Sequence, residues 1–365
     1  MHAQTLDSLL TQTQFSHQDI VTLLSLEDPD HIEQLRQAAE AVTFQYCSNL
    51  VYYRGIVEFS NTCALDCYYC GIRRSNTSVG RFTLTKKEIV EAALWCANEG
   101  YGSVVLQSGE RQDANFVDFV EDTIHTIKTG SVSETLPQGL GITLCVGEQT
   151  PEIYKRFYDA GAHRYLLRIE TTDPDLFQKI HPETQSLDTR LACLTFLRDI
   201  GYQVGTGVMI GLPGQTLDML ARDVAFFRDV SIDMIGMGPY IRSEDTPLPG
   251  AQDIDKSASF KLGLKMIAVA RLVCRDINIA ATTALQALEP NGREQGITFG
   301  ANVTMPNLTP TEVRKDYQLY DGKPCIDEGK GECRNCLLNR VQSVGRKVGF
   351  NAWGDSKHFA ARTRA

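Results

Sequence analysis

Three cysteines lie close together in one short segment of the chain. Cys63, Cys67 and Cys70 have the spacing C-x3-C-x2-C, and Tyr69 directly precedes the last of them. Thiolates favour soft metals and iron–sulfur clusters. A structural zinc site normally has four ligands, and no fourth Cys or His lies nearby in the sequence. Three thiolates on a four-iron cluster would leave one iron open to bind a small molecule. Zinc and three unligated buried thiols are the alternatives.

A second group of three cysteines lies near the C-terminus. Cys325, Cys333 and Cys336 have the spacing C-x7-C-x2-C, which favours an accessory iron–sulfur site. The alternatives are a zinc site completed by a distant residue such as His358, or thiols without a metal. Packing explains the isolated cysteines better than a further cluster does: Cys96, Cys145, Cys193 and Cys274.

The composition indicates a globular protein with a large core. The chain has 365 residues, of which 42% are hydrophobic, and a net charge of −9. This acidic balance gives no basic surface for nucleic acid or for an anionic membrane. The N-terminus lacks the pattern of a signal peptide, and no apolar run approaches the ~20 residues that span a bilayer. We therefore expect a cytoplasmic protein, in which reduced thiols are available to bind metal.

Short β-rich runs alternate with helical patterns after residue 55. Eight such units over about 250 residues predict a (β/α)8 barrel of the TIM type, with a doubly wound open sheet as the alternative. Helical patterns fill the first 50 residues. The predicted organisation is a helical extension (1–50), the barrel (51–310) and a C-terminal segment that closes the barrel (311–365). The predicted strands are 55–60, 103–108, 141–146, 164–169, 203–210, 233–238, 278–284 and 301–305.

Polar residues follow the predicted strands at their carboxyl ends, where barrel enzymes carry out chemistry. Arg168 and Glu170 share a face of the fourth strand by two-residue alternation, so both would point into the barrel mouth. A structural ion pair at a strand end is the alternative interpretation. The other polar residues at these ends are Ser60, Gln107, Ser108, Thr143, Thr282 and Thr283.

The cysteine spacing, with an aromatic residue before the third Cys, resembles that of the radical S-adenosylmethionine (SAM) superfamily. The resemblance implies a catalytic 4Fe-4S cluster on Cys63, Cys67 and Cys70. Its open iron would chelate the amino and carboxylate groups of SAM. One electron into the sulfonium would then release methionine and a 5′-deoxyadenosyl radical.

The same resemblance implies a set of SAM-binding residues. Residues 107–110 stand where the superfamily has Gly-Gly-Glu, although Ser108 replaces the first glycine. Glu170 resembles the ligand of the SAM ribose or amino group, and Arg190 resembles the arginine that binds its carboxylate. Residues 207–216 resemble the segment that lies against adenine. The implied cofactor-binding residues are Tyr69, Gln107, Ser108, Gly109, Glu110, Glu170, Arg190, Met209 and Gly211.

Nearly the whole chain resembles the HydE family, the radical SAM maturases of FeFe hydrogenase. The matching segments are 57–76, 106–110, 165–171, 211–216, 281–310 and the C-terminal cysteine group. The resemblance implies an iron–carbon monoxide–cyanide–cysteine substrate from the sister maturase HydG, transfer towards the scaffold maturase HydF, and a low-potential electron donor. A second cluster, 2Fe-2S or 4Fe-4S, would bind at the C-terminal group. The implied substrate contacts are Ser108, Thr143, Arg168, Thr283 and Tyr320.

Three other functions compete with this interpretation. A methylornithine-synthase-type mutase would share the barrel and the cluster motif, although the C-terminal cysteine group argues against it. A biotin-synthase-like enzyme would need a second cluster inside the barrel, which the isolated cysteines cannot build. A non-catalytic iron–sulfur protein would not need the SAM-contact positions.

Overall fold

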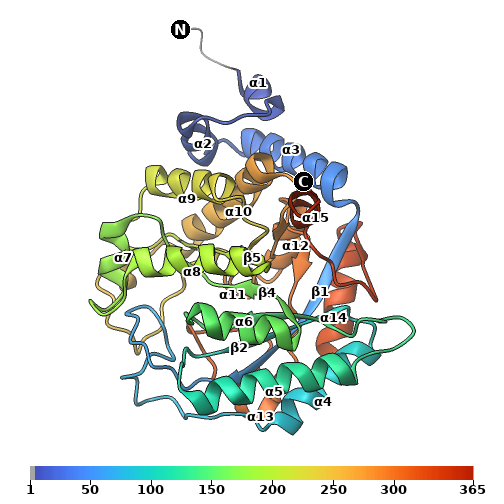
Figure 1. Cartoon of the computed structure of the whole chain (residues 1–365). Coiled ribbons are helices and arrows are strands. Elements are labelled where there is room, and N and C mark those ends of the chain that lie inside the picture. The colour runs from blue at the N-terminus through green and yellow to red at the C-terminus, as the bar shows by residue number, and fades with distance from the viewer. Residues whose placement is uncertain (1–4, 365) are drawn as a thin grey trace.

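The centre of the molecule is a parallel β-sheet that curls into a barrel (Figure 1). The computed structural model describes residues 5–364. Strand order is β10-β1-β2-β3-β4-β5-β7-β9. Hydrogen bonds from Ala281 N to Val303 O and from Asn302 N to Ile279 O, both 2.9 Å, join the two edges. The predicted barrel is therefore confirmed, with the strands β1 (Leu50–Ser60), β2 (Ser103–Ser108), β3 (Gly141–Cys145), β4 (Ala162–Leu166), β5 (Gln203–Thr206), β7 (Met234–Ile235), β9 (Asn278–Ile279) and β10 (Val303–Thr304).

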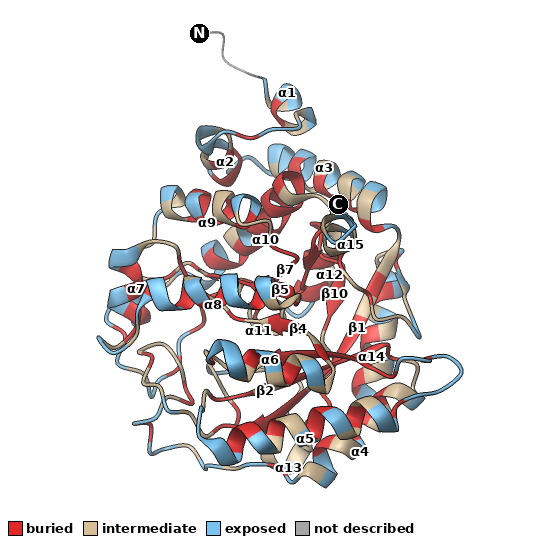
Figure 2. Cartoon of the chain, viewed as in Figure 1, coloured by how far each residue is buried: buried red, intermediate tan, exposed pale blue. Residues whose placement is uncertain are grey.

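The strands are apolar because both of their faces are covered. Most residues of β2 and β3 are buried, since one face fills the barrel and the other meets helices. Figure 2 shows the buried side of each outer helix facing the sheet. The helical patterns between the strands form the outer helices: α4 (Lys86–Asn98), α5 (Ala114–Gly130), α6 (Pro151–Ala160), α8 (Leu187–Ile200), α9 (Leu217–Asp229) and α10 (Lys256–Cys274).

Two predicted strands are each broken in two. The range 203–210 forms β5 and the separate β6 (Met209–Ile210), and 233–238 forms β7 and β8 (Gly238–Pro239). At these breaks the two backbone segments come very close to each other: a Cβ on Gly207 would lie 2.1 Å from Gly236 O. The predicted strand 278–284 also ends early, since α11 (Thr283–Leu288) begins there.

Several short elements escaped prediction. They carry little periodicity of their own and are stabilised by contacts with the barrel. These are α7 (Pro174–Ile180), the 3₁₀ turn η1 (Ala251–Asp253), α12 (Gly292–Thr298), α13 (Thr311–Arg314), α14 (Lys330–Ser343), β11 (Lys347–Val348) and α15 (Lys357–Arg362).

The two ends of the chain lie outside the ring of strands. The N-terminal helices α1 (Leu6–Thr11), α2 (His17–Leu24) and α3 (Pro29–Cys47) form the predicted helical extension, and α3 packs on α10. The C-terminal segment runs beneath the barrel, where the fully buried Arg164 donates to Trp353 O at 2.8 Å and to Asp355 Oδ1 at 3.0 Å. In the described part of the chain, no helix is long and apolar enough to cross a membrane.

Candidate functional site

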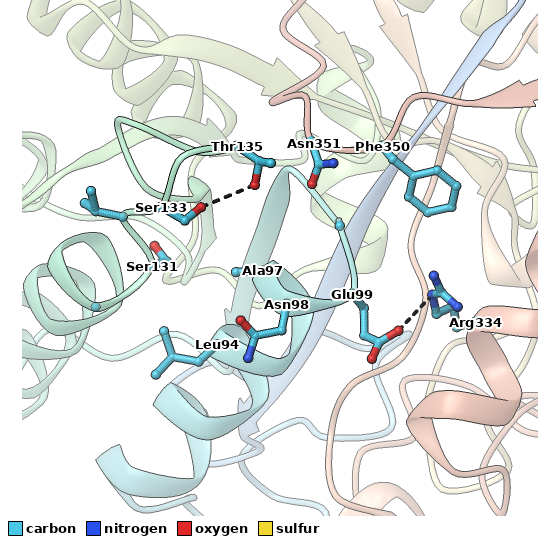
Figure 3. Close-up of a pocket in the computed structure, with 13 residues that line it drawn as sticks. Leu94, Ala97, Asn98, Glu99, Ser131, Ser133, Thr135, Arg334, Phe350 and Asn351 are labelled. Atoms are coloured by element: carbon cyan, nitrogen blue, oxygen red, sulfur yellow. Dashed lines mark hydrogen bonds and ion pairs between the residues drawn. The ribbon is translucent and has the colours of Figure 1, made fainter.

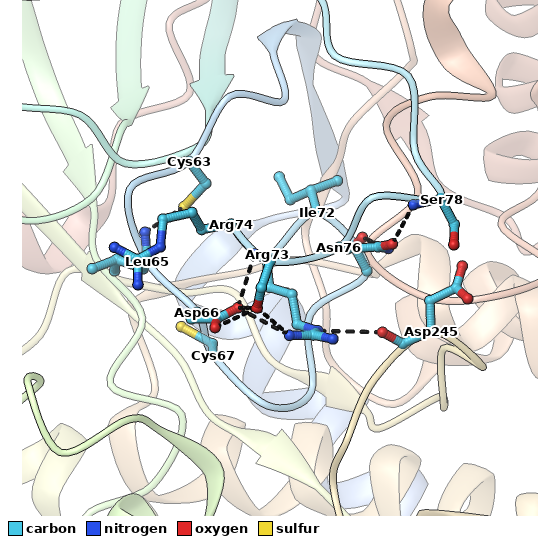
Figure 4. Close-up of polar contacts among 12 residues, drawn as sticks. Cys63, Leu65, Asp66, Cys67, Ile72, Arg73, Arg74, Asn76, Ser78 and Asp245 are labelled. Carbon is cyan, nitrogen blue, oxygen red and sulfur yellow. Dashed lines mark hydrogen bonds and ion pairs between the residues drawn. The ribbon is translucent and has the colours of Figure 1, made fainter.

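The first cysteine group lies on a loop that leaves the carboxyl end of β1 (Figure 4). Asp66 organises this loop, because its carboxylate accepts hydrogen bonds from Arg73 Nη1 at 3.0 Å and from Ser75 N at 3.1 Å. Cys63 Sγ accepts from the backbone N–H groups of Leu65 and Glu110, each at 3.4 Å. Donors of this kind stabilise a thiolate, so the loop suits a ligand sulfur.

Gly109 forms a close support for the cysteine loop. A Cβ at this position would lie 2.4 Å from Thr62 O and 2.8 Å from Cys63 Cβ. Only glycine lets the end of β2 and the loop approach so closely. Residues 107–110 match the superfamily segment at Gly109 because this close approach requires glycine.

The three thiols line one cavity of about 110 Å³ at the barrel mouth. Burial raises the pKa of the Cys63, Cys67 and Cys70 thiols, that of Cys70 to about 12. Buried thiols of this kind need a cation to lose their protons, as metal binding supplies. The cavity also contains seven of the predicted cofactor-binding residues: Tyr69, Gln107, Ser108, Gly109, Glu110, Glu170 and Arg190.

Glu170 faces this cavity with a carboxylate oxygen to spare. Its Oε1 lies 3.3 Å from Arg168 Nε, whereas Oε2 is buried without a partner among the described residues. Alternation along a strand does not explain the pair, because β4 ends at Leu166. Glu170 instead has φ +65°, a conformation that is strained for a non-glycine residue and is common at functional sites.

Arg190 joins the cavity from α8. Its Nε donates to Glu148 Oε1 at 2.6 Å, and its Nη2 lies 3.7 Å from Glu110 Oε2. Burial opposes the charge of Arg190, but Glu148 and Glu110 outweigh it and hold its pKa above the usual value. Burial likewise raises the pKa of Glu110 to about 7, against the effect of Arg190. The sequence analysis missed Glu148.

A second cavity of about 210 Å³ continues from the first. The two share Cys67, Cys70, Arg168 and Glu170 in their walls. The second cavity also brings together Met209 and the predicted substrate contacts Thr283 and Tyr320. The barrel mouth thus joins the cysteine loop to a mostly apolar chamber that carries a few polar and charged groups.

Two predicted residues lie apart from these cavities. Thr143 lines a deeper cavity of about 80 Å³, also bounded by Arg168, and its hydroxyl has no partner in residues 5–364. Gly211 lines none of the three; it has φ +82° and donates to Gln215 Oε1 at 2.7 Å. It therefore shapes the turn after β6, and its contact with SAM stays a prediction.

A buried ion pair in the second cavity escaped the sequence analysis. Lys323 Nζ contacts Glu58 Oε1 and donates to Tyr317 O at 3.1 Å. Glu58 lies on a mostly buried strand, where an acidic residue is itself a signal of a paired or functional group. Its partner, 265 residues away, could not be inferred.

The second cysteine group lies outside these cavities. Cys333 and Cys336 are on α14, and Cys325 precedes it with φ +63°. A hydrogen bond between the thiols lowers the pKa of Cys333 and raises that of Cys325, so their sulfurs are neighbours. The zinc alternative with His358 is wrong, because His358 hydrogen-bonds Ser231 and Asp276.

A larger cavity, about 610 Å³, contains none of the predicted site residues (Figure 3). It lies between the C-terminal ends of α4 and α5 and is bounded by Phe350 and the Arg334–Glu99 ion pair. A large volume alone does not indicate a reaction site. The smaller mouth cavities are lined by thiols, carboxylates and guanidinium groups, which can bind or react.

The donor set of the mouth fits a SAM-bound cluster. Three thiols of one loop, supported by Gly109, line the same cavity, and the free Glu170 Oε2 and the Arg190 guanidinium offer an acceptor and a cation beside them. Within residues 5–364, no three His, Cys, Asp or Glu side chains are placed to hold a single metal ion. A four-iron cluster binds its thiolates at separate corners and does not require such convergence.

Comparisons with known proteins show the family of the chain. The family model of the radical SAM superfamily matches residues 57–227. The FeFe hydrogenase maturase subunit HydE of Thermotoga maritima is 41% identical over 95% of this chain and 96% of its own. The 3-methylornithine synthase of Methanosarcina barkeri is 28% identical over 93% of this chain and 92% of its own.

Two solved structures share the fold. Methylornithine synthase (PylB) is 26% identical, with a TM-score of 0.77 over 95% of this chain and 98% of its own. The FeFe-hydrogenase maturase HydG from Carboxydothermus hydrogenoformans is 19% identical, with a TM-score of 0.80 over 98% of this chain and 81% of its own. The cysteine loop, the barrel and the full-length identity to HydE lead to one conclusion: the chain belongs to the HydE family of hydrogenase maturases, within the radical SAM superfamily.

Proposed function

We propose that this enzyme uses SAM to convert an iron–carbon monoxide–cyanide–cysteine complex during assembly of the di-iron subcluster of FeFe hydrogenase. The observation that carries the proposal is the continuous space at the barrel mouth. It has Cys67, Cys70 and Arg168 in its shared wall, and Thr283 and Tyr320 line the second cavity. The full-length relationship to HydE supports the same reaction class.

The SAM side of this space uses residues from four elements of the barrel. Cys63, Cys67 and Cys70 would hold a 4Fe-4S cluster, which, when bound, supplies the electron that cleaves SAM. Glu110 and Glu170 would accept hydrogen bonds from the SAM amino group and ribose, and Arg190 would pair with its carboxylate; all three line the cavity of the cysteines. Burial of these groups excludes water and strengthens each contact.

The substrate side suits a compact anion. Arg168 keeps its charge because Glu170 raises its pKa, and burial raises the pKa of Tyr320, so its hydroxyl remains a neutral donor. A guanidinium with hydroxyl donors can bind a carboxylate or a cyano-carbonyl complex directionally. We propose that HydG supplies this substrate, HydF receives the product, and a low-potential carrier supplies electrons.

An anaerobic assay tests the proposal. The reconstituted protein is incubated with SAM, dithionite and a synthetic iron–carbonyl–cyanide–cysteine complex, and methionine, 5′-deoxyadenosine and consumption of the complex are followed. The complex should be consumed, and Arg168→Met should reduce this consumption more than it reduces SAM cleavage without substrate. SAM cleavage with no change in the complex would refute the proposed substrate.

A methylornithine-synthase-type mutase is the second candidate, because a relative with that name aligns with 93% of the chain. A parallel arm of the same assay with lysine distinguishes the two. Formation of methylornithine would replace the maturase proposal. Absence of SAM cleavage in every arm would instead favour a non-catalytic iron–sulfur protein.

A further inference from the structure

Arg293 is a buried arginine whose hydrogen-bonding capacity is only partly used. Its side chain is 4% exposed, and its Nη2 donates to Thr283 Oγ1 at 3.2 Å. The Nε and Nη1 groups are buried and have no partner among the described residues. A buried N–H without an acceptor costs about 1–3 kcal/mol, so such a group indicates a missing acceptor.

The second cysteine group is a candidate acceptor. Arg293 is in α12, which packs against α14, the helix that carries Cys333 and Cys336. The next residue in the sequence, Glu294, binds Arg340, whose Nε donates to Cys336 Sγ. Arg293 therefore contacts Thr283, in the wall of the substrate chamber, from a helix that packs against the cysteine helix.

Neighbouring groups already donate to these sulfurs. Arg340 Nε donates to Cys336 Sγ at 3.3 Å, and Gln286 Nε2 lies 3.9 Å from Cys325 Sγ. Arg340 is held in place by Glu294, the residue after Arg293, at 2.8 Å. The cysteine group thus has N–H donors around it, as an anionic iron–sulfur cluster requires.

Arg314 provides a contrast in the same region. This arginine is also buried, but its Nε donates to Thr309 O at 2.6 Å, its Nη1 to Cys325 O at 2.9 Å, and its Nη2 to Asn307 O. All of its nitrogens bond to backbone carbonyls, so its role is structural. The free donors of Arg293 have no such explanation.

We propose that Arg293 donates its free Nε–H and Nη1–H groups to the sulfur ligands of a cluster held by Cys325, Cys333 and Cys336. A guanidinium so placed raises the reduction potential of that cluster, because positive charge and N–H···S bonds favour the more negative reduced state. The inference rests on the proposed HydE-type function, because the resemblance to that family implies a second cluster at this cysteine group. Through Thr283 the same side chain also connects this cluster to the substrate chamber.

The test measures the reduction potential of the second cluster alone. In the full-length chain, Cys63, Cys67 and Cys70 are replaced by alanine, so that only the C-terminal group can be reconstituted. The cluster is titrated with dithionite and followed by electron paramagnetic resonance. Arg293→Gln should lower the ratio of reduced to oxidised cluster at a fixed potential about tenfold, which equals about 59 mV for one electron.

Matched variants make the outcome specific. Arg334→Gln removes the same charge from α14, but Arg334 pairs with Glu99 on the side of the 610 Å³ cavity, and the potential should not change. Arg293→Lys keeps the charge but has a different donor geometry, and it should lower the ratio about threefold. If Arg293→Gln does not fold, the potential measured in Arg293→Lys tests the inference.

Equal potentials in the Arg293 variants and in their parent would overturn the inference. So would failure of the parent to hold any cluster at the C-terminal group. Neither outcome affects the proposed function, which is judged by SAM cleavage in the unaltered chain. Conversely, loss of that proposed function would leave a measured potential shift intact.

Discussion

The two cysteine groups contain the same residues in different surroundings. Cys63, Cys67 and Cys70 lie on one loop that lines the barrel mouth, and Cys63 receives backbone N–H donors. Cys325 and Cys336 belong to a loop and a helix outside the mouth cavities, where Gln286 lies near the first sulfur and Arg340 donates to the second. The first group shares its cavity with carboxylates and an arginine that suit SAM, whereas the second group lines neither mouth cavity.

This difference indicates why one group is a candidate reaction centre and the other an accessory site. A reaction at an open iron needs a cavity beside it, and a site for electron storage or structural support does not.

The largest effect is expected from cysteine substitutions in the first group. Cys67→Ala should reduce SAM cleavage to the assay background, whereas Cys325→Ala should retain it within about threefold, because the groups share no cavity. Production of 5′-deoxyadenosine under dithionite measures both, and equal losses would contradict the comparison.

Glycine substitutions test how closely the first loop is supported. A Cβ at Gly109 would displace the Cys63 loop, and a shift of about 1 Å can cost about 100-fold in rate. Gly109→Ala should therefore lower SAM cleavage about 100-fold and leave a cluster at the C-terminal group unchanged. Gly331→Ala is the matched control, because a Cβ there meets nothing within 4 Å and would lie beside the second group. Similar activities of the two variants would show that the loop adapts.

The sequence indicated which residues lie at the barrel mouth, but it did not indicate the ion pairs that hold them there. Parallel strands bring their carboxyl ends together, so Gln107, Ser108 and the cysteine loop could be placed together from order alone. The pairing of Arg190 with Glu148, and of Lys323 with Glu58, depends on how loops fold over the barrel. No local pattern encodes such contacts.

The same limit explains the misplaced boundaries. The break after Thr206 coincides with a close approach of Gly207 to Gly236, directly after the paired strands β5 and β7, and that pairing joins segments far apart in the sequence. His358 does not complete a zinc site at the second group, because it hydrogen-bonds Ser231 and Asp276 at another part of the fold. Spacing in the sequence indicated which cysteines belong to one group, but not which residues from distant parts of the sequence lie beside them.

Stability provides a third test, because Arg314 supports only the second group. Its guanidinium bonds to backbone carbonyls on both sides of the Cys325 loop. Arg314→Met should lower the free energy of unfolding by about 2–4 kcal/mol, since buried carbonyls lose their donor. Urea denaturation measures this, and Arg334→Met, which breaks a more exposed pair, should cost less than about 1 kcal/mol. SAM cleavage by the folded Arg314→Met protein should remain. An equal loss of SAM cleavage and of stability would mean that the two groups are coupled.

The smallest effect is expected at Cys145, an isolated thiol in the wall of the first cavity. Burial raises its pKa, and no second cysteine on a neighbouring strand accompanies it in the described chain. A ligand to a further cluster inside the barrel would need such partners. Cys145→Ala should therefore change SAM cleavage by less than about twofold and leave the iron content unchanged, because a small buried thiol is replaced by a similar apolar group. A loss of iron in this variant would point to a biotin-synthase-like arrangement and would remove the distinction between grouped and isolated cysteines.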